Sequence, residues 1–330
     1  MDKSAYLLDY KLKSIRWRNK GVQWAWKLFR AILLAGICFV ILYPILLKIA
    51  VSIKSQTDLY DPTIILIPRH FTWDNVRAAV HVMNYGVTLR NTLIVSGLTM
   101  LLQTISCALA GYGFARFEFR GRSVLFALVI LTILVPTQTM IVPMYLQFRH
   151  FDVFGLIGLL TGKDGISLIN TFWPSAITAL TANGLKSGLY IYIFRQFFRG
   201  VPKEIEEASL IDGAGGFRTF FAIMLPNAIP PIVTVMLFSF VWQWNDTFYS
   251  SMFMGQIDLI SNKVTTLASG IGTYLAGIYG VNDTSYRPDP NYVSMIVDTG
   301  VLVSIAPLIL LYLFVQRFFV ESVERTGVVG

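Results

Sequence analysis

The chain has 330 residues, of which 55% are hydrophobic and only 14% charged, and its mean hydropathy is +0.60. A soluble domain carries about 25% charged residues, so this composition excludes an ordinary pair of soluble domains. The net charge is +8, but the basic residues flank apolar runs and form no single stripe, which excludes a nucleic-acid-binding surface. Cys38 and Cys107 both lie inside apolar runs, so we expect packing residues and neither a disulfide framework nor a metal site.

A helix needs about 20 apolar residues to cross a bilayer, and six runs of this chain are long enough. The runs are continuous and not alternating, which excludes a transmembrane β-barrel. The basic segment 1–30 precedes the first run without a convincing small-residue cleavage site, so this run is expected to be a retained span. The predicted fold class is therefore all-α, a polytopic membrane protein with six transmembrane helices over residues 31–51, 92–114, 124–146, 172–194, 228–250 and 293–315.

The basic residues predict the orientation of these spans. If the N-terminus is cytosolic, the four inner segments hold 17 of the 27 Lys and Arg residues, the three outer segments hold 8, and 2 lie within spans. This bias places both termini in the cytosol. The predicted domains are a cytosolic basic segment, residues 1–30, and a six-span domain, residues 31–330, whose cytosolic tail covers residues 316–330.

The inner segment between the fourth and fifth spans reads VPKEIEEASLIDGAGGFRTFFAIMLP, residues 201–226, and is called the elbow below. Pro202 suits the first turn of a helix, and the acidic residues that follow favour the positive end of that helix. Gly213 and its neighbours Gly215 and Gly216 then interrupt it. These features predict a helix–turn–helix.

The second helix of the elbow is expected to start near Phe217 and to close at Pro226. Its apolar residues recur at the spacing of one helix face, which predicts an apolar stripe at the membrane surface. The residues of this stripe are Phe217, Phe220, Phe221 and Met224.

The elbow resembles the coupling loop of ABC-importer permeases, whose pattern is E-A-A, three residues, G, nine residues, I, one residue, L-P. A serine replaces the second alanine, and every other position of the pattern agrees. The matching residues are Glu207, Ala208, Ser209, Gly213, Ile223, Leu225 and Pro226. In that family the loop docks into a cleft of a separate ATPase subunit, so the resemblance implies that these residues, with Glu206, Asp212 and Phe217, contact the ATPase.

Three further segments resemble the maltose-type carbohydrate permeases: FRQFF at 194–198, WND at 244–246 and the tail at 316–330. The resemblance implies a multi-pass protein of the bacterial inner membrane that transports a carbohydrate. The implied partners are a second homologous permease, two copies of an ATPase and an external solute-binding protein, with membrane lipid around the spans. ATP and Mg²⁺ would be used by the ATPase, and this chain would bind no cofactor.

The chain is not expected to be an enzyme, because a phosphate-binding loop needs G, four residues, then GK[ST]. The nearest stretch, GLLTGKD at residues 158–164, has only three intervening residues and ends in Asp.

Charged residues inside spans are expensive and indicate functional sites by default. Lys48, Lys186, Asp246 and Asp298 are of this kind, although Lys48 can also reach the membrane surface with its long side chain. Near the outer end of the fifth span, aromatic and polar residues could stack on a sugar and bond its hydroxyls, or anchor the span at the interface. The candidate pathway residues are Trp242, Trp244, Asn245, Asp246 and Asp298.

Two other transport functions and a structural one compete with a carbohydrate permease. A permease of the same class could carry a non-sugar solute. An ion-coupled secondary transporter often shows two related halves, and no such halves are evident in this sequence. A membrane scaffold would need neither kinked spans nor acidic residues within them.

Overall fold

The computed structural model describes residues 3–153, 155–162, 165–280 and 288–327, without the side chains of residues 3–21, 137, 161 and 318–327. The basic residues of the N-terminal segment up to residue 20, residues 281–287 of the long outer segment and most of the tail's side chains therefore lie outside the described part. The chain divides into two compact units, residues 1–76 and 77–330, and each is taken by itself.

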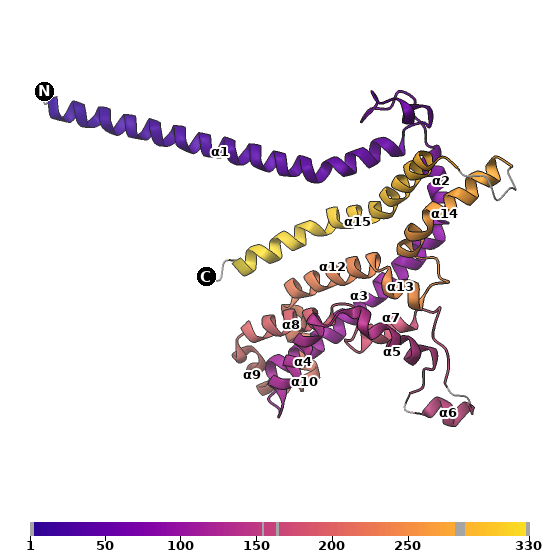
Figure 1. The fold of residues 1–330 in the computed structure, drawn as a ribbon. Helices are drawn as coiled ribbons and strands as arrows, with labels where there is room; N and C mark the ends of the chain where they lie inside the picture. Colours follow the sequence, from indigo (N-terminus) through magenta and orange to yellow (C-terminus); the bar gives the residue numbers. More distant parts are fainter. Residues whose placement is uncertain (1–2, 154, 163–164, 281–287, 328–330) are drawn as a thin grey trace. The chain divides into compact units, whose positions relative to one another are not determined.

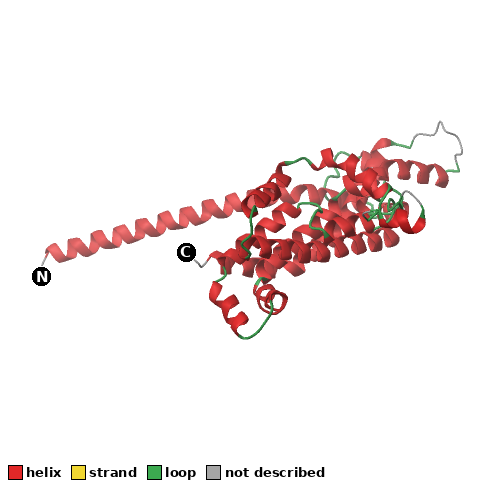
Figure 2. Cartoon of the chain, turned by 90° about the horizontal axis from the view of Figure 1, so that it is seen from below, coloured by secondary structure: helices red, strands yellow, loops and turns green. Residues whose placement is uncertain are grey.

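Helices account for almost all of the regular structure (Figures 1 and 2), and two isolated β-bridges are the other pairing within the described residues. The elements in chain order are α1 (Lys3–Ser52), the 3₁₀ helix η1 (Thr57–Tyr60), α2 (Asp74–Val82), α3 (Tyr85–Arg116), α4 (Arg122–Leu134), α5 (Thr137–Arg149), α6 (Leu156–Thr161), α7 (Trp173–Leu180), α8 (Ser187–Gly200), α9 (Lys203–Ile211), α10 (Gly216–Thr219), the π-helix η2 (Phe220–Met224), α11 (Leu225–Asn227), α12 (Ile229–Asn245), α13 (Phe248–Phe253), α14 (Ile260–Ile278) and α15 (Pro290–Gly327).

The first unit joins the long helix α1 to a small hydrogen-bonded cap. The buried carboxylate of Asp58 accepts hydrogen bonds from the backbone N–H groups of Arg69 and His70, each at 2.8 Å, and contacts Nδ1 of His70 at 2.7 Å. Burial alone would raise the pKa of Asp58, but these hydrogen bonds outweigh it and hold the pKa below its ordinary value. The Asn75 amide donates to the carbonyl of Lys54 at 2.7 Å, which ties the end of the cap back to the end of α1.

In the second unit, α3 lies at the centre and packs against α7, α8 and α12 (Figure 1). Its contact with α8 is close because Gly111 faces that helix. A β-carbon at Gly111 would lie 2.5 Å from Cβ of Phe194 and 3.0 Å from the backbone nitrogen of Arg195. Small residues let helices approach in this way inside a membrane, where lipid supplies no hydrophobic drive for helix association.

The core of the second unit includes three clusters of buried apolar side chains. The first joins α3, α8 and the end of the elbow, the second joins α2, α14 and α15, and the third joins α3, α5 and α13 with the loops beside them. The first cluster is rich in aromatic rings, and Tyr112 contacts the rings of both Phe198 and Phe220. It therefore fixes the elbow to the centre of the helix bundle.

The structure supports an all-helical membrane protein but does not confirm six continuous spans. Among the described residues, three helical stretches are long and apolar enough to cross a membrane: Val22–Ser52, Tyr85–Arg116 and Pro290–Arg317. They contain the predicted spans 31–51, 92–114 and 293–315. Two bent pairs raise the number to five if each pair forms one span.

The predicted third span, residues 124–146, is not one helix. α4 and α5 meet at a 104° bend. Val135 has extended backbone angles, φ −69° and ψ 123°, because the ring of Pro136 disfavours the helical conformation of the residue before it. The break therefore follows from Pro136.

The predicted fourth and fifth spans are also interrupted. Residues 172–194 divide into α7 and α8, because Ala182 and Lys186 adopt left-handed angles, φ 53° and φ 60°, that end one helix and begin the next. Residues 228–250 divide at Asp246, where α12 ends and a separate short helix, α13, follows.

Replacing Gly111 with Ala should destabilise the second unit by about 1–3 kcal/mol, because the added methyl group meets the backbone of α8. Gly97→Ala is the matched control: Gly97 lies in the same helix, and nothing lies within 4 Å of its added methyl group. The measurement is the thermal unfolding midpoint of the purified chain in detergent. Equal midpoints for the two variants would contradict close packing of α3 on α8.

Candidate functional site

The elbow consists of two helical segments joined by a turn. Pro202 precedes α9 with extended angles, and α9 ends at Ile211. Gly213 has φ 81°, a conformation that costs glycine little and side chains with a β-carbon more. After the turn, α10, η2 and α11 continue as helix through Asn227 and then meet α12 at an 81° bend. Pro226 does not close this stretch, because it occupies the first turn of α11, where its missing N–H is not needed.

Glu206 fastens the elbow to α3. Its carboxylate accepts a hydrogen bond from the Tyr112 hydroxyl at 2.5 Å and pairs with Nε of Arg116 at 3.2 Å. Arg116 also donates to the carbonyl of Val201 at 2.6 Å. The structure thus turns Glu206 inward, to contacts with the bundle. The hydroxyls of Ser209 and Thr219, bonded at 2.9 Å, join the two arms of the elbow.

The predicted apolar stripe of the second arm is split between two environments. Phe220 and Met224 are buried, while Phe217 is 78% exposed. The π-helix η2 explains the split, because its wider turn changes the angular spacing of the residues along this arm. Ile211, at the end of the first arm, is 85% exposed. The turn of the elbow therefore has one exposed apolar residue on each side. These two residues, Ile211 and Phe217, are called the apolar tip below.

The remaining predicted docking residues differ in exposure. Glu207, Ala208, Asp212 and Pro226 are exposed, Ile223 and Leu225 are half-buried, and Ser209 is buried. The exposed members lie along α9, its end and the start of α11, beside the apolar tip.

A second group of polar residues surrounds the break between α7 and α8. The Gln103 amide donates to the carbonyl of Leu185 at 2.7 Å and to the Ser187 hydroxyl at 2.8 Å, and its oxygen accepts from the Ser239 hydroxyl at 2.6 Å. The Ser106 hydroxyl donates to the carbonyl of Ala179 at 2.6 Å. Two side chains of α3 thus join this helix to α7, α8 and α12.

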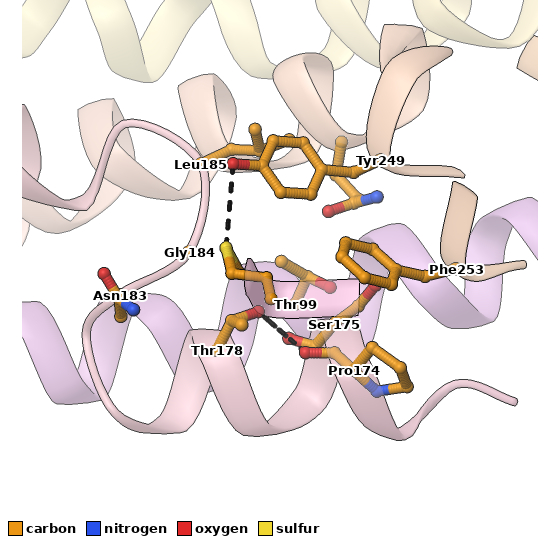
Figure 3. Close-up of a pocket in the computed structure, with 11 residues that line it drawn as sticks. Thr99, Pro174, Ser175, Thr178, Asn183, Gly184, Leu185, Tyr249 and Phe253 are labelled. Atoms are coloured by element: carbon orange, nitrogen blue, oxygen red, sulfur yellow. Dashed lines mark hydrogen bonds between the residues drawn. The ribbon is translucent and has the colours of Figure 1, made fainter. Parts of the chain in front are cut away.

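A small cavity of about 20 Å³ lies beside this break (Figure 3), roughly the room that one water molecule needs. Thr99 of α3, Ser175 and Thr178 of α7, Gln243 of α12 and Tyr249 of α13 line it. The Thr99 hydroxyl is buried and has no hydrogen-bond partner within the described residues. The polar groups among its lining residues can bond a single water molecule.

Near the predicted pathway, Trp244 is buried against Phe240, and the Asn245 amide donates to the carbonyl of Val241 at 2.9 Å. The carboxylate of Asp246 accepts from the backbone N–H of Ser250 at 2.7 Å and from that residue's hydroxyl at 2.9 Å, so it caps α13.

The last two predicted pathway residues lie on different helices. Trp242 of α12 is 48% exposed, and Asp298 is half-buried in α15. Their role in a pathway remains a prediction.

Sequence reasoning missed Gln103, Thr99 and Thr178. Gln103 carried a signal, because an amide within an apolar run must find partners in the bundle. Thr99 and Thr178 carried none, since a threonine can bond its own helix backbone and needs no other partner.

Residues 107–325, about two thirds of the chain, match the family described as the inner membrane component of binding-protein-dependent transport systems. The chain belongs to this family. The matched range contains the elbow, the break between α7 and α8 and all five predicted pathway residues. As a family member the chain is a membrane permease component and not an enzyme.

Curated relatives match most of this permease. The arabinooligosaccharides transport system permease protein AraQ of Halalkalibacterium halodurans is 27% identical over 299 residues, covering 90% of this chain and 94% of the relative. The diacetylchitobiose uptake system permease protein NgcG of Streptomyces coelicolor is 27% identical and covers 87% and 83%. A chain from the crystal structure of a bacterial ABC transporter that imports the acidic polysaccharide alginate has a TM-score of 0.70 at 21% identity, covering 89% and 96%. This last match supports the fold.

Gln103→Leu should destabilise this permease by about 1–3 kcal/mol, because the Leu185 carbonyl and the Ser239 hydroxyl lose their buried partner. Gln196→Leu is the matched control, since Gln196 is exposed and makes only a 3.5 Å contact with Tyr192. The thermal unfolding midpoint in detergent measures both. If the Gln103 variant unfolds no earlier than the Gln196 variant, the amide does not hold the break.

Proposed function

We propose that the chain is the permease subunit of an ATP-driven importer for a carbohydrate, most simply an oligosaccharide, and that the elbow couples it to a separate ATPase. The observation that carries the coupling role is the apolar tip of the elbow. Ile211 and Phe217 are 85% and 78% exposed on either side of a turn that Glu206 anchors to α3. An apolar tip on a held support is suited to a hydrophobic cleft of a partner.

The substrate class rests on the relatives. AraQ is named for arabinooligosaccharides, NgcG for diacetylchitobiose and the MelC protein of Bacillus subtilis for melibiose, raffinose and stachyose. All three names describe short oligomers of sugars. The same class for this chain agrees with the threonine, glutamine and tyrosine side chains beside the small cavity at α12, which can bond hydroxyls.

The proposed assembly contains a second homologous permease, two copies of the ATPase and an external solute-binding protein. This chain would form half of the translocation pathway within the lipid bilayer. ATP and Mg²⁺ are used by the ATPase, and this chain binds no cofactor. In the pathway we propose roles for Trp242 and Asn245, which are exposed, for Asp246 and Asp298, which are half-buried, and for the buried Trp244.

A second candidate is a permease of the same class for a different solute. The permease protein GgtD of Synechocystis, named for uptake of osmoprotective compounds, is 26% identical over 249 residues. Its match covers 73% of this chain. A small compatible solute therefore remains the alternative substrate for the same fold.

Gly213→Val should uncouple transport, because a β-branched residue is strained at φ 81° and would shift the apolar tip away from its cleft. No atom lies within 4 Å of a β-carbon at this position, so the effect would come from the backbone alone. The measurement is co-purification of the ATPase with the membrane subunits, and we expect at least about a tenfold loss.

Gly213→Asn is the matched control, because asparagine tolerates left-handed angles and should retain most of the association. Unchanged ATPase recovery with valine would contradict coupling through this turn. Equal losses in both variants would show that the glycine matters for another reason than its backbone angle.

The proposed orientation has six passes, with the segments 31–51, 124–146 and 228–250 running outward and the elbow in the cytosol. It rests on the excess of Lys and Arg in the inner segments. A phosphatase reporter fused after Gly330 should be inactive, and one inserted at Asn282 should be active, because this reporter works only outside the cytosol. The reverse pattern would overturn the orientation.

A further inference from the structure

Lys186 is a half-buried cation beside the break between α7 and α8. It immediately precedes α8, whose 14 residues lead to the elbow. At about 1.5 Å per residue, Lys186 lies roughly 13 Å further along the helix direction than Arg195, the nearest cation of α8 on the elbow side. That distance is nearly half of a hydrocarbon core about 30 Å thick. The ammonium therefore cannot be assigned to the surface on the elbow side.

The ammonium of Lys186 lies 4.9 Å from the ring centroid of Trp242. Within the described part of the chain it has no carboxylate partner at ion-pair distance. A ring face attracts a cation but leaves its positive charge uncompensated. A charged residue within an apolar stretch of a membrane protein indicates a functional site by default.

The pair is partly exposed and lies beside the cavity at the break between α7 and α8. Trp242 is 48% exposed, so this chain leaves much of its ring uncovered. The chain neighbours Leu185 and Gln243 line the small cavity (Figure 3), and so does Thr99, whose buried hydroxyl has no hydrogen-bond partner in the described residues. A cation, a partly exposed indole ring and one unpaired hydroxyl thus lie around the break between α7 and α8.

This combination selects one class of sugar. The C–H face of a pyranose stacks on an indole ring, and neutral sugars need nothing more than hydroxyl-bonding groups beside it. An ammonium adds attraction for a carboxylate, sulfate or phosphate substituent and repels amino sugars. We propose that Lys186 and Trp242 form a subsite for an anionic sugar unit, a uronic acid or a sugar ester. The inference rests on the proposed function and adds a charge to its substrate.

The test uses the complete importer, purified with its ATPase in nanodiscs. The probes are trigalacturonate and the neutral galactose trimer obtained by reducing its carboxyl groups, with sulfated and phosphorylated trimers as further anionic probes. Ligand binding is followed by the rise in the unfolding midpoint of the permease at fixed ionic strength. The wild-type importer should be stabilised by at least one anionic probe more than by the neutral one.

Lys186→Met should weaken binding of the preferred anionic probe at least about tenfold while leaving the neutral probe unaffected, and Lys186→Arg should retain the preference. Lys263→Met is the matched control: it removes the same charge from a lysine that pairs with Asp258 at 2.9 Å. Trp242→Phe should weaken every probe that binds, whatever its charge. Together the variants distinguish an effect of the charge at Lys186 on probe binding from an effect of the net charge of the chain.

Three results would overturn the subsite. The first is a wild-type importer that responds equally to neutral and anionic probes or to none of them. The second is a preference that survives Lys186→Met. The third is loss of the second permease from the Lys186→Met complex, which would assign the ammonium to a carboxylate across the subunit interface. Failure of the ATPase to co-purify with the wild-type chain would instead contradict the proposed function.

Discussion

A helix that breaks inside a membrane leaves backbone N–H and C=O groups without water to bond them, and each unsatisfied group costs several kcal/mol. The break between α7 and α8, within the stretch predicted as the fourth span, satisfies its backbone groups through α3. Ser106 donates to the carbonyl of Ala179 on one side of the break, and Gln103 donates to that of Leu185 on the other. The cavity, the start of α8 and the left-handed backbone of Lys186 all depend on these two side chains.

The same helix also holds the elbow. At one end of α3, Tyr112 donates a hydrogen bond to Glu206 and Arg116 forms an ion pair with it. Gln103 lies 9 and 13 residues from Tyr112 and Arg116, or about 14–20 Å along the helix. The elbow begins where α8 ends and runs into α12, and Gln103 bonds both of these helices through Ser187 and Ser239. The break and the elbow are therefore two ends of one connected set of helices, so a force on the elbow acts on elements that border the cavity.

The sequence predicted the elements whose signals are local. Long apolar runs predicted the helices that contain residues 31–51, 92–114 and 293–315, and a glycine after an acidic helix predicted the turn at Gly213. Apolar composition could not distinguish a continuous helix from a broken one, because lipid and bundle accept the same side chains. The breaks at Val135 and Lys186 depend on backbone angles, and the left-handed residues Ala182 and Lys186 are not glycines that would have marked them.

At the candidate sites, too, the sequence predicted what depends on local signals and not what depends on packing. The spacing of the elbow motif identified the segment, but it could not show that Glu206 turns toward Arg116 while Ile211 points away, because that choice is made by the packing of Tyr112 and Phe220. In the pathway segment, an acidic residue in an apolar run indicated a site. The structure gives Asp246 the hydrogen bonds of a helix cap, a role that its position just before α13 made available.

Polarity along α3 is reversed relative to a helix of a soluble protein. Its buried positions are mostly polar or small, while its exposed positions from Leu93 to Leu109 are all leucine or isoleucine, as suits a helix whose outer face meets lipid. Five buried polar residues recur every three or four positions, namely Thr88, Thr92, Ser96, Thr99 and Gln103, and Thr104 follows directly after the last. Thr88 and Thr92 bond backbone carbonyls of their own region, and Gln103 bonds its neighbours. Ser96 and Thr99 have no partner within the described residues. Because an unpaired hydroxyl is costly away from water, this stretch of α3 marks the depth at which the bundle can admit water or a hydroxylated solute.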